Sequence, residues 1–259
     1  MGTIGKIRII AFALLLFAAA SAGPAYARDE IDCLACHGEL TAGLKAHTAL
    51  SMGCVSCHGG IDASEIPHRI INSMKRGLLA DPPRLCYSCH DEKNFVNKHI
   101  HPALETGCGS CHNPHASRTG MLLKAPVPEL CNGCHDRALF TKNVQHGPAA
   151  AGLCLKCHDP HSSRYASLLV TEPVRLCGMC HATALSERHL INGTAGKGHP
   201  VGMVKEMDDR KRIKDPFRKG KRFCCVSCHD PHSADTAFLV RFPMKSAMEI
   251  CKNCHRDVF

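Results

Sequence analysis

The longest apolar stretch of the chain lies close to its N-terminus. Lys6 and Arg8 precede an apolar run over residues 9–20, and Ala25-Tyr26-Ala27 follows as a small-residue cleavage motif. A basic start, a short apolar segment and such a motif are typical of a secretory signal peptide, and the run is too short for a spanning helix. We therefore expect residues 1–27 to be a signal peptide that is removed on export. The alternative is an uncleaved anchor, although no stop-transfer segment follows.

Beyond this leader, the hydrophobic pattern shows neither long helical periodicity nor sustained strand alternation. The chain also has no Trp, three Tyr and nine Phe, which is little material for an ordinary core. Pro83, Pro128 and Pro173 occupy positions where proline is tolerated in a first helical turn, so we expect short helices around 129–140 and 174–187. The pattern predicts a mostly irregular fold with short α-helices and little or no β-sheet, filled by something other than side chains.

The cysteines and many of the histidines follow one spacing rule. The pattern C-x-x-C-H occurs nine times and takes in all but one of the 19 cysteines. The cysteine pairs are Cys33/Cys36, Cys54/Cys57, Cys86/Cys89, Cys108/Cys111, Cys131/Cys134, Cys154/Cys157, Cys177/Cys180, Cys225/Cys228 and Cys251/Cys254. The histidines that follow them are His37, His58, His90, His112, His135, His158, His181, His229 and His255.

This spacing is the attachment signature of haem c. Two thiols about one turn apart can form thioethers with the porphyrin vinyl groups, and the adjacent imidazole then reaches the iron as its proximal ligand. Zinc sites have no need of a histidine after every second cysteine, and disulfide scaffolds space their cysteines irregularly. The sequence therefore predicts nine covalently bound haem c groups, which form the interior and without which the chain should not fold.

One cysteine stands outside the rule. Cys224 directly precedes Cys225. It could compete for haem as part of a C-x-x-x-C-H variant, pair with another chain, or have no role. We interpret it as a bystander thiol.

The motifs recur in pairs. CGSCHNPHAS, CLKCHDPHSS and CVSCHDPHSA begin at Cys108, Cys154 and Cys225, and each precedes a second motif that follows Leu or Ile. A looser pair begins at Cys54, and Cys33 heads an unpaired half. These residues resemble the doubled C-x-x-C-H family of multihaem cytochromes, which is similar to class III cytochromes c, over most of the mature chain. The resemblance implies low-potential, largely bis-histidine haems and electron transfer in the periplasm or at the cell surface.

The pairing predicts the organisation of the chain. We expect a leading single-haem segment at 28–46 and haem-pair repeats at 47–98, 99–145, 146–192 and 193–259. The last repeat contains a basic insertion at 205–222, with nine basic and four acidic residues. This insertion is either a solvated loop or a docking surface for an acidic redox partner.

Ten histidines lie outside the motifs. Eight occupy repeating places, either ahead of the first cysteine of a pair or directly after a proline, and we expect them to be distal iron ligands. These eight are His47, His68, His101, His115, His146, His161, His199 and His232. His99 and His189 fall outside this register, and we expect one of them to serve the haem of the unpaired Cys33 motif.

Local geometry restricts which haem a distal histidine can serve. His115 lies three residues after His112, so both side chains project from nearly the same side of a turn. His115 cannot reach the opposite face of the haem held by His112 and should ligate a different one. The same reasoning applies to His161 after His158 and to His232 after His229.

The formal charge of +9 would ordinarily suggest nucleic acid or a membrane surface as a partner. Haem propionates would offset much of this charge, so we expect no nucleic-acid partner. The leading interpretation is an exported electron carrier with no catalytic residues and no transmembrane segment in the mature chain. Its partners would be redox proteins, such as quinol-oxidising or outer-membrane cytochromes. The alternatives are a multihaem reductase of a small oxyanion or sulfur compound, which needs an open axial position, and a subunit of an extracellular cytochrome filament.

Overall fold

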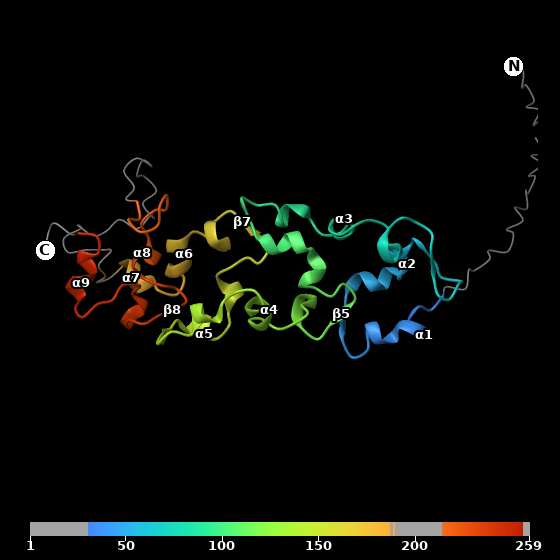
Figure 1. The fold of residues 1–259 in the computed structure, drawn as a ribbon, viewed down its shortest axis with the longest axis horizontal. Coiled ribbons are helices and arrows are strands. Elements are labelled where there is room, and N and C mark those ends of the chain that lie inside the picture. The colour runs from blue at the N-terminus through green and yellow to red at the C-terminus, as the bar shows by residue number, and fades with distance from the viewer. Residues whose placement is uncertain (1–30, 187–188, 190–213, 256–259) are drawn as a thin grey trace, which may run out of the picture.

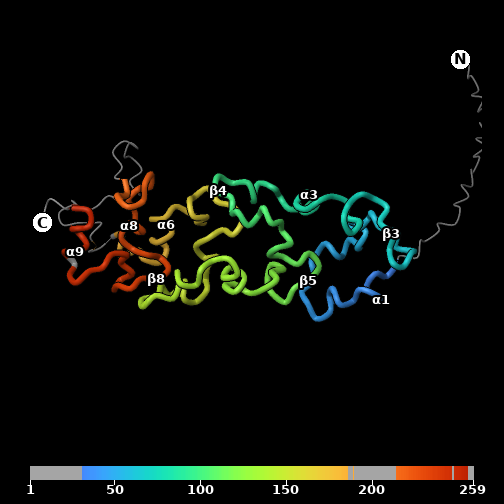
Figure 2. Tube along the Cα trace, in the orientation of Figure 1, coloured from blue at the N-terminus to red at the C-terminus, as the bar shows by residue number. Residues whose placement is uncertain are grey.

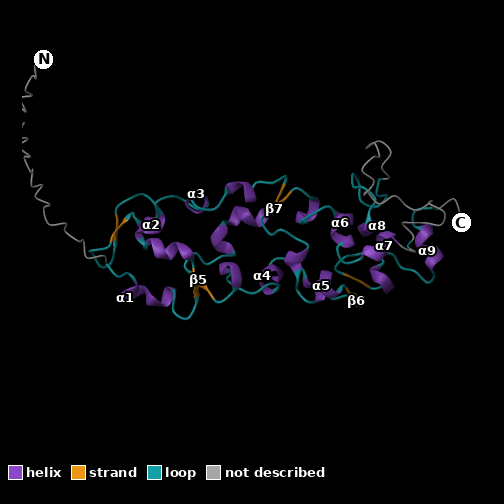
Figure 3. Cartoon of the chain, turned by 180° about the vertical axis from the view of Figure 1, so that it is seen from behind, coloured by secondary structure: helices purple, strands orange, loops and turns teal. Residues whose placement is uncertain are grey.

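The computed structural model describes residues 31–186, 189 and 214–255, so the expected signal peptide lies outside the described residues. The chain forms an elongated body in which position along the sequence follows position along the long axis (Figure 1). Helices are short and loops predominate in the described part (Figure 3). The only sheets of the described residues are small and two-stranded. The structure therefore confirms the expected fold class, which is mostly irregular with short α-helices and little β-sheet.

The α-helices of the described residues are four to six residues long. They are α1 (Leu34–His37), α2 (Val55–His58), α3 (Arg84–Tyr87), α4 (Glu129–Asn132), α5 (Gly147–Ala150), α6 (Pro173–Gly178), α7 (Ala182–Ser186), α8 (Cys225–Cys228) and α9 (Ala247–Lys252). Single 3-10 turns connect them: η1 (Gly38–Leu40), η2 (Thr48–Met52), η3 (Lys75–Gly77), η4 (Glu92–Asn94), η5 (Pro102–Thr106), η6 (Cys108–Ser110), η7 (Gly120–Leu122), η8 (Arg137–Phe140), η9 (Cys154–Lys156), η10 (Ala166–Leu168) and η12 (Ala237–Leu239). None of the described helices is long and apolar enough to cross a membrane.

Every C-x-x-C-H motif closes one turn in the same way. The backbone N–H of the motif histidine donates to the carbonyl of the first cysteine at 2.8–3.0 Å in all nine motifs. The helices expected at 129–140 and 174–187 are each broken in two, into α4 and η8 and into α6 and α7. In the first case Asp136 starts a new turn, because its side chain accepts a hydrogen bond from the N–H of Ala138 at 2.9 Å.

Short antiparallel strands join segments that are distant in the sequence. The long-range pairs are β1 (Lys45–Ala46) with β5 (Ala116–Ser117), β4 (His99–Ile100) with β7 (Ser162–Ser163), and β6 (Val144–Gln145) with β8 (Ser233–Ala234). β2 (Ile61–Asp62) and β3 (Arg69–Ile70) instead form a local hairpin. Figure 2 shows β5 against the early part of the chain.

These strand pairs contain much of the protein's own core. Ala116 and Ser233 are 0% exposed and Ser162 is 1% exposed. The buried hydroxyls are satisfied, since Ser162 donates to the carbonyl of Asn94 at 3.0 Å and Ser233 to that of Leu139 at 2.8 Å. Small residues permit the close approach of two backbones, and each strand pair thereby connects a segment to the next one along the body.

Candidate functional site

Eight motif histidines each face a histidine from outside the motifs, with ring centroids 5.9–6.1 Å apart. The pairs are His37–His68, His58–His115, His90–His47, His112–His161, His135–His101, His158–His232, His181–His146 and His229–His189. Metal–nitrogen bonds of about 2 Å on both sides of one iron hold two imidazole centroids roughly 6 Å apart. The spacing therefore fits one haem iron between each pair of rings.

Backbone carbonyls orient the histidines of the motifs that begin at Cys54, Cys108, Cys154 and Cys225. Nδ1 of these histidines lies 2.7–3.0 Å from a carbonyl oxygen, in the pairs His58–Arg76, His112–Met121, His158–Ser167 and His229–Phe238. A carbonyl can only accept, so Nδ1 carries the hydrogen and Nε2 keeps its lone pair for a metal. The chain thus selects the tautomer that an iron ligand needs.

The carbonyls that orient these rings come from strained positions. Arg76, Met121, Ser167 and Phe238 have φ between 56° and 60°, a region that non-glycine residues seldom occupy. Sequence reasoning missed them. The signal that could have identified them is the Leu-Leu or Leu-Val pair that recurs shortly before a second motif, for example Leu122-Leu123 and Leu168-Leu169.

Six of the candidate distal histidines are held in pairs at the long-range strand junctions. At the first junction the N–H of His47 donates to the carbonyl of His115 at 2.7 Å, and Nδ1 of His47 donates to the carbonyl of Pro114 at 3.0 Å. The same two contacts join His101 to His161 and Pro160, and His146 to His232 and Pro231. Each junction therefore holds the distal candidates of two neighbouring motifs.

The junctions also separate each x-Pro-His histidine from the motif directly before it. The ring of His115 faces His58, whereas His112 faces His161. His161 and His232 likewise face motif histidines of the preceding segment, His112 and His158. This is the arrangement that cross-ligation between segments requires.

The structure changes the expectation for the first motif. His37 faces His68, which the β2–β3 hairpin carries, and not His99 or His189. His189 instead faces His229, with ring centroids 6.1 Å apart. His99 lies in β4 opposite Ser163, and no ring contact of the described residues joins it to a motif histidine. His199 lies outside the described residues.

Successive motifs also contact one another through their cysteines. Interacting thiols are found in the pairs Cys33–Cys54, Cys86–Cys108, Cys131–Cys154 and Cys177–Cys225. Burial, and then Cys108, raises the pKa of the Cys86 thiol to about 11, and a hydrogen bond with Cys225 lowers that of Cys177 to about 7. Thioether formation would remove the thiol protons and with them these pKa shifts. The contacts between the cysteines still show which attachment points lie next to one another.

The polypeptide covers the attachment cysteines to different extents. The second cysteine is exposed in the leading motif and in the closing motif of each pair. These residues are Cys36, Cys89, Cys134, Cys180 and Cys254. In the opening motifs a returning segment covers the second cysteine, as the N–H of Leu79 donates to the carbonyl of Cys57 and that of Lys124 to Cys111, both at 2.9 Å.

No returning segment of the described chain makes that contact with the five exposed cysteines. Their thiols therefore lie at the surface of the polypeptide, where a porphyrin vinyl group can reach them. Their role in haem attachment stays a prediction from the motif.

Partial burial favours the neutral form of several distal histidines. Desolvation lowers the pKa of His115, His161, His189 and His232 below the ordinary value for histidine. A neutral imidazole is the form that binds a metal. These rings are therefore suited to ligation by both orientation and protonation.

Comparison with known proteins agrees with this chemistry. The family model "Doubled CXXCH motif" matches residues 101–139, 146–185 and 215–258, and the model "Cytochrome c7 and related cytochrome c" matches residues 40–113. The multiheme cytochrome MtrA of Shewanella baltica (strain OS185) is 38% identical over 69 residues, which are 25% of this chain and 21% of the relative. The chain thus matches only about a fifth of that relative's length.

Proposed function

Because the chain belongs to the doubled CXXCH multihaem cytochromes c, we propose that it is an exported carrier that passes electrons between redox proteins through nine covalently bound haems. The bound haems supply reversible one-electron chemistry. The observation that carries the proposal is the facing of eight motif histidines by a second histidine. The two imidazoles of each pair would hold one iron between them, which would suit electron transfer and leave no position for a substrate.

The repeat supplies the remaining distal ligand. In the three preceding haem-pair repeats, the histidine ahead of the first cysteine faces the histidine of the second motif, as His47 faces His90. The same rule assigns His199 to His255. His99 is then the one histidine of the chain without a proposed iron.

The arrangement of the attachment points supports a relay from end to end. The motifs follow one another along the elongated body (Figure 1). Cysteine contacts and strand junctions alternate between successive motifs from Cys33 to Cys225. The chain's residues keep neighbouring sites close and hold each ring in a fixed orientation. Together with the expected signal peptide, this arrangement favours a carrier in the periplasm or at the cell surface. Such a carrier would receive electrons from one redox partner and deliver them to another, such as a quinol-oxidising or outer-membrane cytochrome.

Carbon monoxide separates the carrier from the reductase alternative. The reduced holoprotein should bind almost no carbon monoxide. Its redox titration should lie mostly below zero millivolts, because two histidine ligands lower the reduction potential, and should be broad, because neighbouring haems interact. One full equivalent of bound carbon monoxide, together with turnover of nitrite or hydroxylamine, would assign the protein to the reductases instead.

A further inference from the structure

A compact cationic loop, residues 214–222, stands beside the last pair of motifs. Five of its nine residues are basic, and Asp215 is its only acid. Lys214, Lys219 and Lys221 are exposed, and none of the three forms an ion pair in the described part of the chain. Within the described part of the chain, the loop therefore presents three exposed lysines to solvent.

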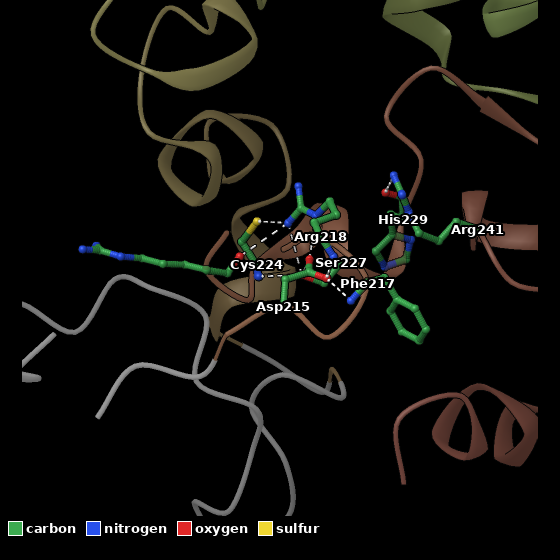
Figure 4. A network of polar contacts seen from close by, with 8 residues as sticks. Asp215, Phe217, Arg218, Cys224, Ser227, His229 and Arg241 are labelled. Atoms are coloured by element: carbon green, nitrogen blue, oxygen red, sulfur yellow. Dashed lines mark hydrogen bonds and ion pairs between the residues drawn. The ribbon is translucent and has the colours of Figure 1, made fainter. Parts of the chain in front are cut away.

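A buried carboxylate fixes the shape of this loop. The Asp215 side chain is 0% exposed, and both of its oxygens accept two hydrogen bonds (Figure 4). Oδ1 accepts from the backbone N–H groups of Phe217 and Arg218 at 2.9 Å, and Oδ2 accepts from Nε of Arg218 and Oγ of Ser227 at 2.6 Å. Its own N–H donates to the carbonyl of Lys221 at 2.9 Å. Burial alone would raise the pKa of Asp215, but the hydrogen bonds from Ser227 and Arg218 reverse the effect and lower it.

The same carboxylate ties the loop to a haem-attachment motif. Ser227 lies between Cys225 and Cys228, whereas the corresponding hydroxyls of Ser56 and Ser110 donate to local backbone carbonyls. In the last pair of motifs, the motif serine Ser227 therefore bonds to the loop and not to the local backbone. The lysines are consequently held in a fixed position beside this attachment point.

Cys224 is part of this anchor and not of the haem motif. Its thiol is buried and lies 3.3 Å from Nη2 of Arg218, and its N–H donates to Oγ of Ser227 at 3.0 Å. α8 begins at Cys225, and the N–H of His229 donates to the carbonyl of Cys225, as in the other motifs. The motif is therefore complete without Cys224, which packs beneath the loop.

We propose that the loop at 214–222 is the docking site for the acidic face of an electron-transfer protein, and that electrons cross to or from this chain at the haem held by Cys225 and Cys228. The inference rests on the proposed carrier function. A merely solvated loop needs no buried carboxylate, which is costly unless fully hydrogen-bonded. A preorganised cluster of cations, by contrast, steers an acidic partner and loses little freedom when the partner binds.

The test measures electron transfer from an acidic protein to the haem-loaded chain. In the loop variant, Lys214, Lys219 and Lys221 are changed to Glu. The matched control changes Lys93, Lys98 and Lys142 to Glu and so alters the net charge equally. These lysines are also exposed and form no ion pair in the described part of the chain. Reduced flavodoxin is the donor: its flavin is oxidised by one electron and one ferric haem is reduced.

We expect the second-order rate constant of the loop variant to fall about tenfold or more at low ionic strength. The control should change less than twofold, and the variants should converge in high salt. Equal falls in both variants, or no fall in either, would overturn the proposal. Asp215→Asn leaves the lysines in place while weakening their anchor, and should lower the rate with nine haems still attached; an unchanged rate would refute the role of preorganisation.

Parallel measurements test what else the lysines could do. If the lysines only balance haem propionates, the loop variant shifts a haem potential but keeps the flavodoxin rate, and docking is excluded. Loop-dependent binding to phosphatidylglycerol vesicles without an effect on that rate would assign the loop to a membrane surface instead. If dithionite reduces the wild-type protein but flavodoxin does not, the docking proposal alone is overturned. If dithionite cannot reduce the haems reversibly, the carrier function is overturned.

Discussion

Replacement of His115 by Ala tests how the chain distributes its distal ligands. The His115 ring lies 6.0 Å from that of His58 at an interplanar angle of 19°, while His112, three residues away in the sequence, faces His161. The variant should therefore open the iron on His58 and leave the iron on His112 six-coordinate. Because His47 bonds to the backbone carbonyl of residue 115, the strand junction should survive the substitution.

The size of the effect follows from the number of sites. One of nine haems should become high spin, and the reduced variant should bind one equivalent of carbon monoxide, against almost none for wild type. The loss of a partly buried ring should cost stability within the usual range of about 0.5–3 kcal/mol. Haem content by pyridine haemochrome should remain nine.

Haem deletion locates the open iron. Adding Cys54→Ala and Cys57→Ala to His115→Ala should leave eight haems and abolish carbon monoxide binding, because the open haem is the one removed. The matched control adds Cys108→Ala and Cys111→Ala and should keep the binding. The opposite pattern would show that His115 serves the haem on its own neighbouring motif and would refute cross-ligation.

Three further outcomes are expected. The mature protein should have the mass of the chain from Arg28 plus nine haems. A stoichiometric zinc content, or fewer than eight haems from a host with working maturation machinery, would contradict the interpretation of the motifs as haem-attachment sites. His189→Ala should create one carbon monoxide site, whereas His99→Ala should create none; the reverse result would reassign the ligand of the Cys225 haem. Ser167→Val should lower the free energy of unfolding, measured with denaturant, by about 1–3 kcal/mol, because a β-branched residue fits poorly at a φ of 57°. Ser167→Gly should leave it nearly unchanged. Equal losses in the two variants would show that the backbone conformation at residue 167 does not determine the effect.

The sequence by itself was sufficient for the features that depend on the spacing of residues within and next to each motif. Attachment needs two cysteines and a histidine within one turn, so the motifs could be identified without any knowledge of the fold. The separation of His115 from the haem of His112 also follows from a three-residue spacing. The irregular fold follows because nine cofactors, and not side chains, were expected to fill the interior, and the structure confirms that fold class.

Only the tertiary structure decided which distant residues meet. His68, and not His99 or His189, faces His37, because the local β2–β3 hairpin brings His68 back towards the first motif. His189 instead faces His229, in the last pair of motifs. The buried role of Asp215 depends on Ser227, twelve residues away across a turn, and no local pattern marks it. Such partners are set by the closure of loops and by the pairing of strands far apart in the chain, and these depend on how the whole body packs rather than on the spacing of adjacent residues.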